Sequence, residues 1–312
     1  MSDPRSWNLW HGCRKYSEGC QNCYVYFLDD LRGTNAPSAE VRRTGNFDLP
    51  LRRDRSGQYK IPPGFVVSVN MTSDTFIEDA DRWRGEMWDI IRTRSDVIFQ
   101  LVTKRIPRME ECLPVDWGDG YDNVILIMTC ENQRAFDERW PVFMKIPSKH
   151  KGLNLAPFIG PVDVRPALAS GQIEQVEICG EAFGGERPCR YEWIKDVSDA
   201  CTEYRVNLNV GPIGTVYIRD GKEYRFESMQ QMTDTAYKTK LSRFYGRPVY
   251  DLYDPIDDHR LTGSEIPEPM FNKVKCRRCT RMQMCMGCVD CGNCRNVELI
   301  DYDAMIELRK DD

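Results

Sequence analysis

Short apolar runs alternate with amphipathic stretches along most of the chain. The apolar runs predict strands at residues 65–71, 97–102, 124–129, 153–156, 176–180 and 206–210. Apolar residues spaced three and four apart predict helices at 79–94, 104–112, 133–144 and 190–203. Strands without polar alternation, separated by helices, indicate a parallel sheet that is covered on its faces.

Together with an initial element near the N-terminus, the pattern gives about six βα units, where a full barrel has about eight. The sequence therefore predicts an α/β fold, a partial (β/α)6 TIM-like barrel over residues 1–212, with an open doubly wound sheet as the alternative. Residues 213–270 follow as a hairpin at 215–226, a helix at 229–243 and a proline-rich connection, since Asp220-Gly221 suits a tight primed turn. Residues 271–312 form a third, cysteine-rich region.

The composition indicates the cellular compartment and the use of the cysteines. No apolar run reaches membrane-spanning length, and the start of the chain lacks the shape of a signal peptide, so we expect a cytoplasmic protein without a membrane partner. Of the 14 cysteines, three lie between Cys13 and Cys23 and six between Cys276 and Cys294. Such clustering in a chain that is not exported favours metal ligands over disulfides. The net charge of −5 excludes no class of partner.

The N-terminal cluster reads Cys13-x6-Cys20-x2-Cys23-Tyr24, ahead of a short predicted helix that Gly33 ends. Three closely spaced thiolates suggest a [4Fe–4S] cluster in which one iron has no protein ligand. His11 lies two residues before Cys13, so a closed zinc site with three cysteines and one histidine is the alternative.

The opening Trp7-Asn8-Leu9-Trp10-His11-Gly12-Cys13 with Cys20-x2-Cys23-Tyr24 resembles phage-associated three-cysteine proteins of the radical S-adenosylmethionine (SAM) superfamily. Further segments match in the family's order: 45–47, 50–52, 69–76, 99–105, 131–133, 160–162, 180–181 and 187–188. The resemblance covers about residues 5–200. It departs from the superfamily in its first cysteine gap, which is six residues rather than the commonest three, and in the length of chain that follows the last strand.

The resemblance implies that Cys13, Cys20 and Cys23 hold the cluster and that SAM binds its fourth iron. Reductive cleavage of SAM then gives a 5′-deoxyadenosyl radical, which abstracts hydrogen from the substrate. Phage membership implies a nucleic-acid substrate, and the reaction we expect is rearrangement of an amino-acid-modified thymidine in phage DNA, an isomerisation. An electron donor such as flavodoxin or ferredoxin is a further implied partner.

Polar residues that follow the predicted strands are candidates for holding SAM, because ligands bind at the carboxyl ends of strands in such folds. These candidates are Ser73, Asp74, Thr103, Lys104, Glu131 and Asn132. Tyr24 is expected to lie beside the adenine of SAM. Ordinary capping of the next helix, or packing in the core for the tyrosine, would explain the same residues equally well.

The C-terminal cluster comprises Cys276, Cys279, Cys285, Cys288, Cys291 and Cys294. Its opening spacing resembles the auxiliary-cluster domains, of SPASM or twitch type, that several radical SAM enzymes carry. That resemblance implies one or two auxiliary [4Fe–4S] clusters, and paired zinc knuckles are the alternative.

Two further functions stay open at the level of sequence. Auxiliary clusters are common in radical SAM enzymes that modify peptides, and a zinc-stabilised nucleic-acid-binding protein without catalysis would also need clustered cysteines. The basic stretch near the first cysteines offers a contact for a DNA or RNA backbone, at Arg42, Arg43, Arg52, Arg53 and Arg55, although a solvated loop explains it as well.

Overall fold

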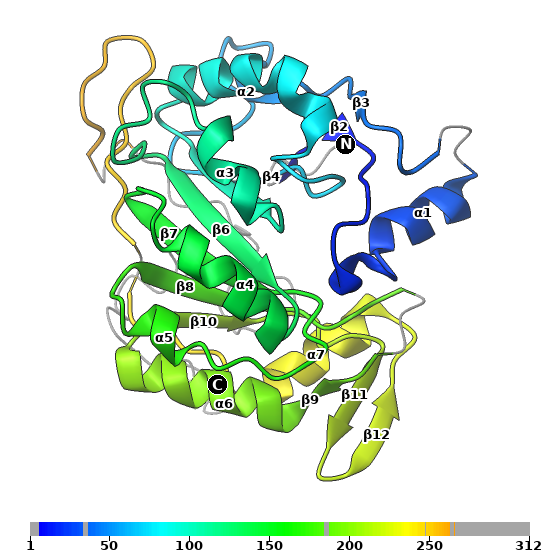
Figure 1. Ribbon diagram of the computed structural model, residues 1–312. Helices are drawn as coiled ribbons and strands as arrows, with labels where there is room; N and C mark the ends of the chain where they lie inside the picture. Colours follow the sequence, from blue (N-terminus) through cyan, green and yellow to red (C-terminus); the bar gives the residue numbers. More distant parts are fainter. Residues whose placement is uncertain (1–5, 34–36, 184–186, 247, 263–264, 266–312) are drawn as a thin grey trace. The chain divides into compact units, whose positions relative to one another are not determined.

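The computed structural model describes residues 6–33, 37–183, 187–246, 248–262 and 265 (Figure 1). The strands are β1 Ser6–Trp7, β2 Trp10–His11, β3 Arg42–Arg43, β4 Val66–Val69, β5 Ile98–Thr103, β6 Val124–Cys130, β7 His150–Leu155, β8 Ile173–Ile178, β9 Cys189–Arg190, β10 Asn207–Val210, β11 Val216–Arg219 and β12 Lys222–Arg225. The α-helices are α1 Tyr24–Arg32, α2 Asp81–Thr93, α3 Ile106–Cys112, α4 Gln133–Phe143, α5 Arg165–Leu168, α6 Tyr191–Tyr204 and α7 Met229–Lys238. Three short 3-10 helices are η1 Glu18–Cys20, η2 Leu49–Leu51 and η3 Glu78–Ala80.

The main sheet has seven strands in the order β1-β4-β5-β6-β7-β8-β10. The pairs β1–β4, β4–β5, β5–β6 and β8–β10 are all parallel. The α/β class and the parallel sheet are therefore confirmed, and the architecture is compatible with an α/β partial barrel. The specific (β/α)6 type stays a prediction.

Burial explains why the apolar runs become strands. Every residue of β6 is buried, and β5 alternates only slightly, as expected for a sheet that helices cover. Helix α2 turns Met87, Trp88 and Ile91 inward, at the spacing of three and four that predicted it.

The chain divides into two compact units, each of which is built from segments that are not consecutive in the sequence. Of the described residues, the first unit comprises 6–33, 37–129, 141–151, 249–262 and 265, and the second comprises 130–140, 152–183, 187–246 and 248. The predicted domain boundaries at 212 and 270 stay predictions. The six C-terminal cysteines and their auxiliary clusters lie outside the described residues.

The second unit contains the predicted hairpin, formed by β11 and β12 in antiparallel register. Asp220 and Gly221 both have positive φ, 52° and 73°, as a type I′ turn requires. Helix α7 follows and begins at a capping box, in which Ser228 accepts from the Gln231 amide.

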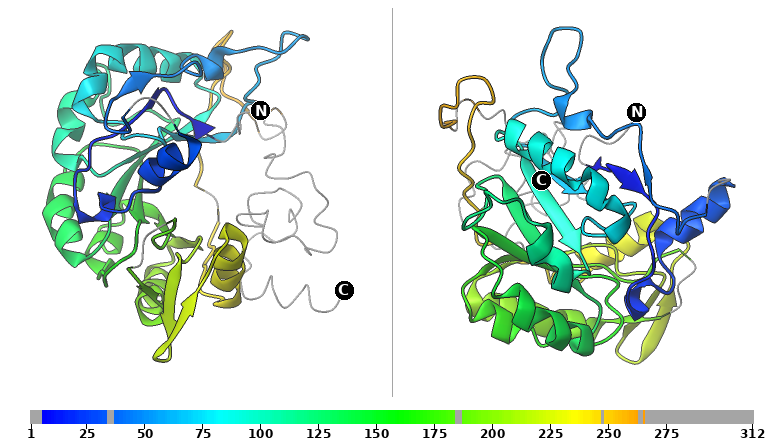
Figure 2. Two further views of the ribbon diagram at one scale, coloured as in Figure 1. Left: turned by 90° about the vertical axis from the view of Figure 1, so that its right-hand side faces the viewer. Right: turned by 45° about the horizontal axis from the view of Figure 1, so that its top comes forward.

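In the first unit, residues 52–60 form an exposed basic loop with a buried base. The Asp54 carboxylate accepts from the amides of Ser56 and Gln58 at 2.8 and 3.1 Å and shapes its tip. At its base, the Tyr59 ring contacts the guanidinium of Arg94, which is fully buried. The right view of Figure 2 shows the loop, in blue, extending away from the helices.

Arg94 uses its donors on several segments at once. It pairs with Asp96 at 2.8 and 2.9 Å and donates to the carbonyls of Ile61, at 2.6 Å, and Pro50. A buried arginine is tolerated only when its donors are satisfied, and here they join the ends of the basic loop to the turn between α2 and β5.

Within the described part of the chain, no helix combines the length and the apolar character needed to cross a bilayer.

Candidate functional site

The first cysteine loop connects β2 to α1 and is held mainly through backbone atoms. The Cys13 amide donates to the Ser38 carbonyl at 2.8 Å, and the Gly12 amide donates to the Thr72 carbonyl at 3.2 Å. Gly12 has φ +93°, and a Cβ there would lie 2.1 Å from the Glu40 carbonyl oxygen. Only glycine fits this backbone path, which sets where Cys13 leaves β2.

The residues that precede the loop fix it to the sheet. The Trp7 indole donates to the Phe47 carbonyl at 2.9 Å, and the Trp10 indole donates to the Asp74 carbonyl at 3.1 Å. The side-chain oxygen of Asn70, at the end of β4, accepts from the Leu9 amide at 3.0 Å. These motif residues therefore support the cysteine loop.

All three loop thiols are free, partly exposed and close together. Burial, together with the negative charge of Asp74 and the neighbouring thiols Cys20 and Cys23, raises the pKa of Cys13 to about 12, although the charge of Arg105 acts in the opposite direction. Burial also raises the pKa of Cys23, and the charge of Lys104 offsets part of this increase. Three free thiols beside two cations are a donor set that suits an anionic metal–thiolate group.

The zinc alternative would use His11 as its fourth ligand, and it stays a prediction beside the cluster. His11 Nε2 contacts the buried Asp29 carboxylate at 2.8 Å.

Asp74 and Thr103 lie beside the cysteine loop, and their side chains are held by local hydrogen bonds. Asp74 Oδ1 accepts from the Thr103 hydroxyl at 2.7 Å and the Phe76 amide at 2.9 Å. Its Oδ2 accepts from the Lys104 amide at 3.1 Å and lies 3.6 Å from the Arg105 guanidinium. Both residues thus organise the loops that follow β4 and β5. Neither caps a helix, because α2 and α3 have Ala80 and Arg105 as their N-cap residues and no side-chain cap.

Ser73 and Tyr24 also reach the first cysteine loop. The Ser73 hydroxyl donates to the Gly12 carbonyl at 2.5 Å, and the Tyr24 hydroxyl donates to the Met71 carbonyl. Together with Lys104, they lie in the same unit as the three cysteines. Five of the predicted SAM contacts are therefore brought around this loop.

Arg105 is the site residue that sequence reasoning missed. It is buried, donates to the Arg14 carbonyl at 3.0 Å and lies near enough to Cys13 to lower the pKa of its thiol. The only signal was its place directly after Thr103 and Lys104, at the end of β5. Nothing in its local pattern separates it from other arginines.

Glu131 and Asn132 belong to the second unit and carry structural contacts there. Glu131 is buried and pairs with Arg139 on α4 at 2.9 Å. The Asn132 side chain accepts from the Ala135 amide at 3.0 Å at the start of α4. Their assignment to SAM stays a prediction.

Residues 3–242 match the family described as "Protein of unknown function (DUF5131)". The chain belongs to this family. Comparisons with curated proteins and with solved structures give no match.

The DUF5131 match includes both the cysteine loop and the basic stretch at 42–55. Most of these arginines have partners. Arg43 forms a bidentate pair with Glu86, and Arg52 pairs with Asp48 at 2.7 Å. The Arg53 guanidinium stacks on Tyr59.

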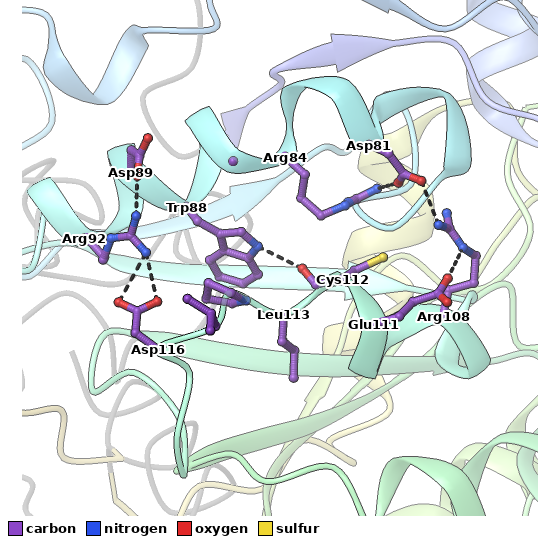
Figure 3. A pocket seen from close by; sticks show the side chains of 13 residues that line it. Asp81, Arg84, Trp88, Asp89, Arg92, Arg108, Glu111, Cys112, Leu113 and Asp116 are labelled. Carbon is purple, nitrogen blue, oxygen red and sulfur yellow. Dashed lines mark hydrogen bonds and ion pairs between the residues drawn. The ribbon is translucent and has the colours of Figure 1, made fainter.

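A separate hollow of about 610 Å³ lies between α2 and the segment that contains α3 (Figure 3). Trp88 and Cys112 line it between two ion pairs, Arg92 with Asp116 and Arg108 with Glu111. None of the predicted site residues lines it. Because these charged groups of its wall neutralise one another, we assign no chemistry to it.

Proposed function

We propose that this DUF5131 protein is a radical SAM enzyme of the cytoplasm. The observation that carries the proposal is the loop of three free thiols, Cys13, Cys20 and Cys23, which lie close together beside the cations of Lys104 and Arg105. When bound, a [4Fe–4S] cluster there would supply an electron for the cleavage of SAM to a 5′-deoxyadenosyl radical, which abstracts hydrogen from the substrate.

The chain's own residues would hold and orient the groups. Lys104 offers a cation for the SAM carboxylate, and Ser73 offers a hydroxyl for its ammonium. Arg105 offsets the negative charge that thiolates bring, and Gly12 holds the path of the loop. Asp74 and Thr103 support these loops from behind through their mutual hydrogen bond.

Anaerobic reconstitution tests the proposal. We expect brown protein that converts SAM to 5′-deoxyadenosine in the presence of a strong reductant. Cys20→Ala should lose about four irons per chain and the cleavage activity. Cys112→Ala, which removes a buried free thiol of the same unit, is the matched control and should keep both. Cleavage that survives Cys20→Ala, or colourless protein that carries only zinc, would contradict the proposal.

For the substrate we propose DNA, with rearrangement of an amino-acid-modified thymidine as the reaction. Support comes from the exposed basic loop, where Arg55 and Lys60 have no ion pair within the described residues. A base in a duplex must be flipped out or offered single-stranded before an enzyme can act on it.

Fluorescence anisotropy with a labelled single-stranded oligonucleotide tests this part separately. Arg55→Gln with Lys60→Gln should weaken binding and reduce the salt slope by about 1.4, because each phosphate contact on a single strand contributes about 0.7 to the slope. Lys222→Gln with Arg225→Gln, on the exposed β12, is the matched control. An unchanged salt slope in the loop variant would remove this support for DNA.

A further inference from the structure

One face of the sheet in the second unit carries polar side chains where a parallel sheet is normally apolar. In β8 and β10, Val176, Ile178, Leu208 and Val210 are buried. The alternate positions, which point to the other face, hold Glu177 and Asn209 and are partly exposed. In β7, Asn154 is likewise the partly exposed exception in a buried strand.

Three of these polar residues lie side by side across neighbouring strands. Asn209 on β10 is in register with Glu177 on β8. The Cys179 amide donates to the Leu155 carbonyl at 3.0 Å, and in a parallel pair this bond places Asn154 beside Glu177. The same geometry holds between β10 and β8, where the Gly211 amide donates to the Ile178 carbonyl and Val210 is paired with Ile178. Asn154, Glu177 and Asn209, here called the polar row, therefore point to the same face.

The polar row has more acceptors than donors to fill them. Asn209 Nδ2 donates to Glu177 Oε1 at 3.3 Å, so the Asn209 carbonyl oxygen is directed elsewhere. Asn154 Oδ1 is buried and accepts no hydrogen bond from the described residues. No described cation pairs with Glu177, and burial raises the pKa of its carboxyl. A buried acceptor and an uncompensated carboxylate are both costly to keep without a ligand.

A same-face neighbour shows what a purely structural amide looks like here. Asn207 lies two residues before Asn209, and its side chain donates to the Gly246 carbonyl at 2.7 Å and accepts from the Tyr245 amide at 2.7 Å. Both of its polar atoms are thus used by the fold. In the polar row, in contrast, no backbone segment of the described chain meets the remaining oxygens.

We propose that the polar row binds the protonated primary amine of a ligand. One carboxylate and two amide carbonyl oxygens supply three acceptors and one negative charge, and a primary ammonium brings three N–H donors and one positive charge. A calcium ion would need six to eight oxygen ligands, about twice what the row provides. This site goes beyond the proposed cluster chemistry and does not depend on it.

Side-chain amide resonances of Asn154 and Asn209 report on this site directly. The probe is ethylammonium chloride, titrated to about 100 mM into the protein without iron or SAM, which keeps the result independent of the cleavage assay. We expect saturable shifts of both amide pairs. Tetramethylammonium, which has the same charge but no N–H donor, should give none.

Two variants sharpen the test. Glu177→Gln keeps the shape and an acceptor for Asn209 but removes the charge, and should weaken ethylammonium binding by about tenfold or more. Glu174→Gln, the same change near the start of β8, should leave the affinity unchanged. The proposal is wrong if wild-type shifts fail to saturate, if tetramethylammonium produces equal shifts, or if Glu177→Gln binds as well as wild type.

Discussion

Gly12 shows how far the cysteine loop depends on one missing methyl group. Its φ of +93° is strained for any other residue, and its Cβ would strike the Glu40 backbone. We expect Gly12→Ala to lower the free energy of unfolding by more than about 2 kcal/mol and to reduce iron uptake on reconstitution. Gly57→Ala is the matched control, because Gly57 also has positive φ but a methyl group added there would meet no atom within 4 Å.

If both alanine variants lose stability equally in urea unfolding, backbone strain alone is responsible and the close approach to Glu40 contributes nothing. If Gly12→Ala binds iron normally, the loop path does not matter for metal binding.

Lys151 is a buried cation whose ammonium donates to the carbonyls of Phe143 and Met144, at 3.1 and 3.3 Å, at the end of α4. Burial lowers its pKa to about 8 from 10.5. Between these values the unfolded chain holds one more proton than the folded chain, so stability should rise with pH, by roughly 3 kcal/mol in total. Lys151→Met should remove this rise.

Urea unfolding between pH 7 and 10.5 measures the difference between variant and wild type. Lys149→Met is the control. Asp122 raises the pKa of Lys149, so the loss of this lysine should not abolish the increase in stability with pH. A Lys151→Met curve parallel to the wild-type curve would show that Lys151 stays protonated throughout this range.

At the scale of elements, the capping box of α7 should make a measurable contribution to stability. Ser228 and Gln231 exchange hydrogen bonds at the helix start, where the first amides have no partner inside the helix. Ser228→Ala should cost about 1 kcal/mol of stability and speed hydrogen exchange of the Gln231 amide. Thr233→Ala, on a partly exposed position inside the same helix, should leave that exchange rate unchanged. Equal exchange in both variants would contradict the cap.

Periodicity was enough to predict the long elements, because burial on one side leaves a repeat in the sequence. Strands β4, β5, β6 and β10 and helices α2 and α6 lie within a few residues of their predicted ranges. Strands β1, β2, β3 and β9 have two residues each, too few for any repeat to appear. Helix α7 ends before the predicted residue 243 because Arg243 pairs through its backbone with Leu208 on β10.

Local sequence patterns likewise predict only part of the candidate site. Cysteine spacing predicts which thiols gather, since they lie in one short loop. The use of Asp74 and Thr103 could not be predicted, because each oxygen could equally cap a helix or meet a ligand until its partners are known. Asn154, Glu177 and Asn209 come from three strands, and their alignment depends on register, which no local pattern contains.

At the scale of the whole molecule, the described cysteines fall into two populations. Cys112, Cys130, Cys189 and Cys201 are buried, whereas the three loop cysteines and Cys179 are partly exposed. Brief alkylation with a maleimide, followed by peptide mass spectrometry, should label the loop cysteines first in metal-free protein. Reconstitution with iron and sulfide should protect them and leave the buried set unchanged. Equal labelling of the loop before and after reconstitution would place the metal elsewhere.

The buried base of the basic loop has a consequence for proteolysis. Trypsin can reach Arg53 and Arg55 because the loop is exposed, yet Arg94 holds the carbonyls of Pro50 and Ile61 on either side of it. A cut in the loop therefore leaves both new ends attached to the same buried guanidinium. The protein should survive such a nick as a folded pair of fragments, which makes the loop a natural place to insert a tag or to split the chain.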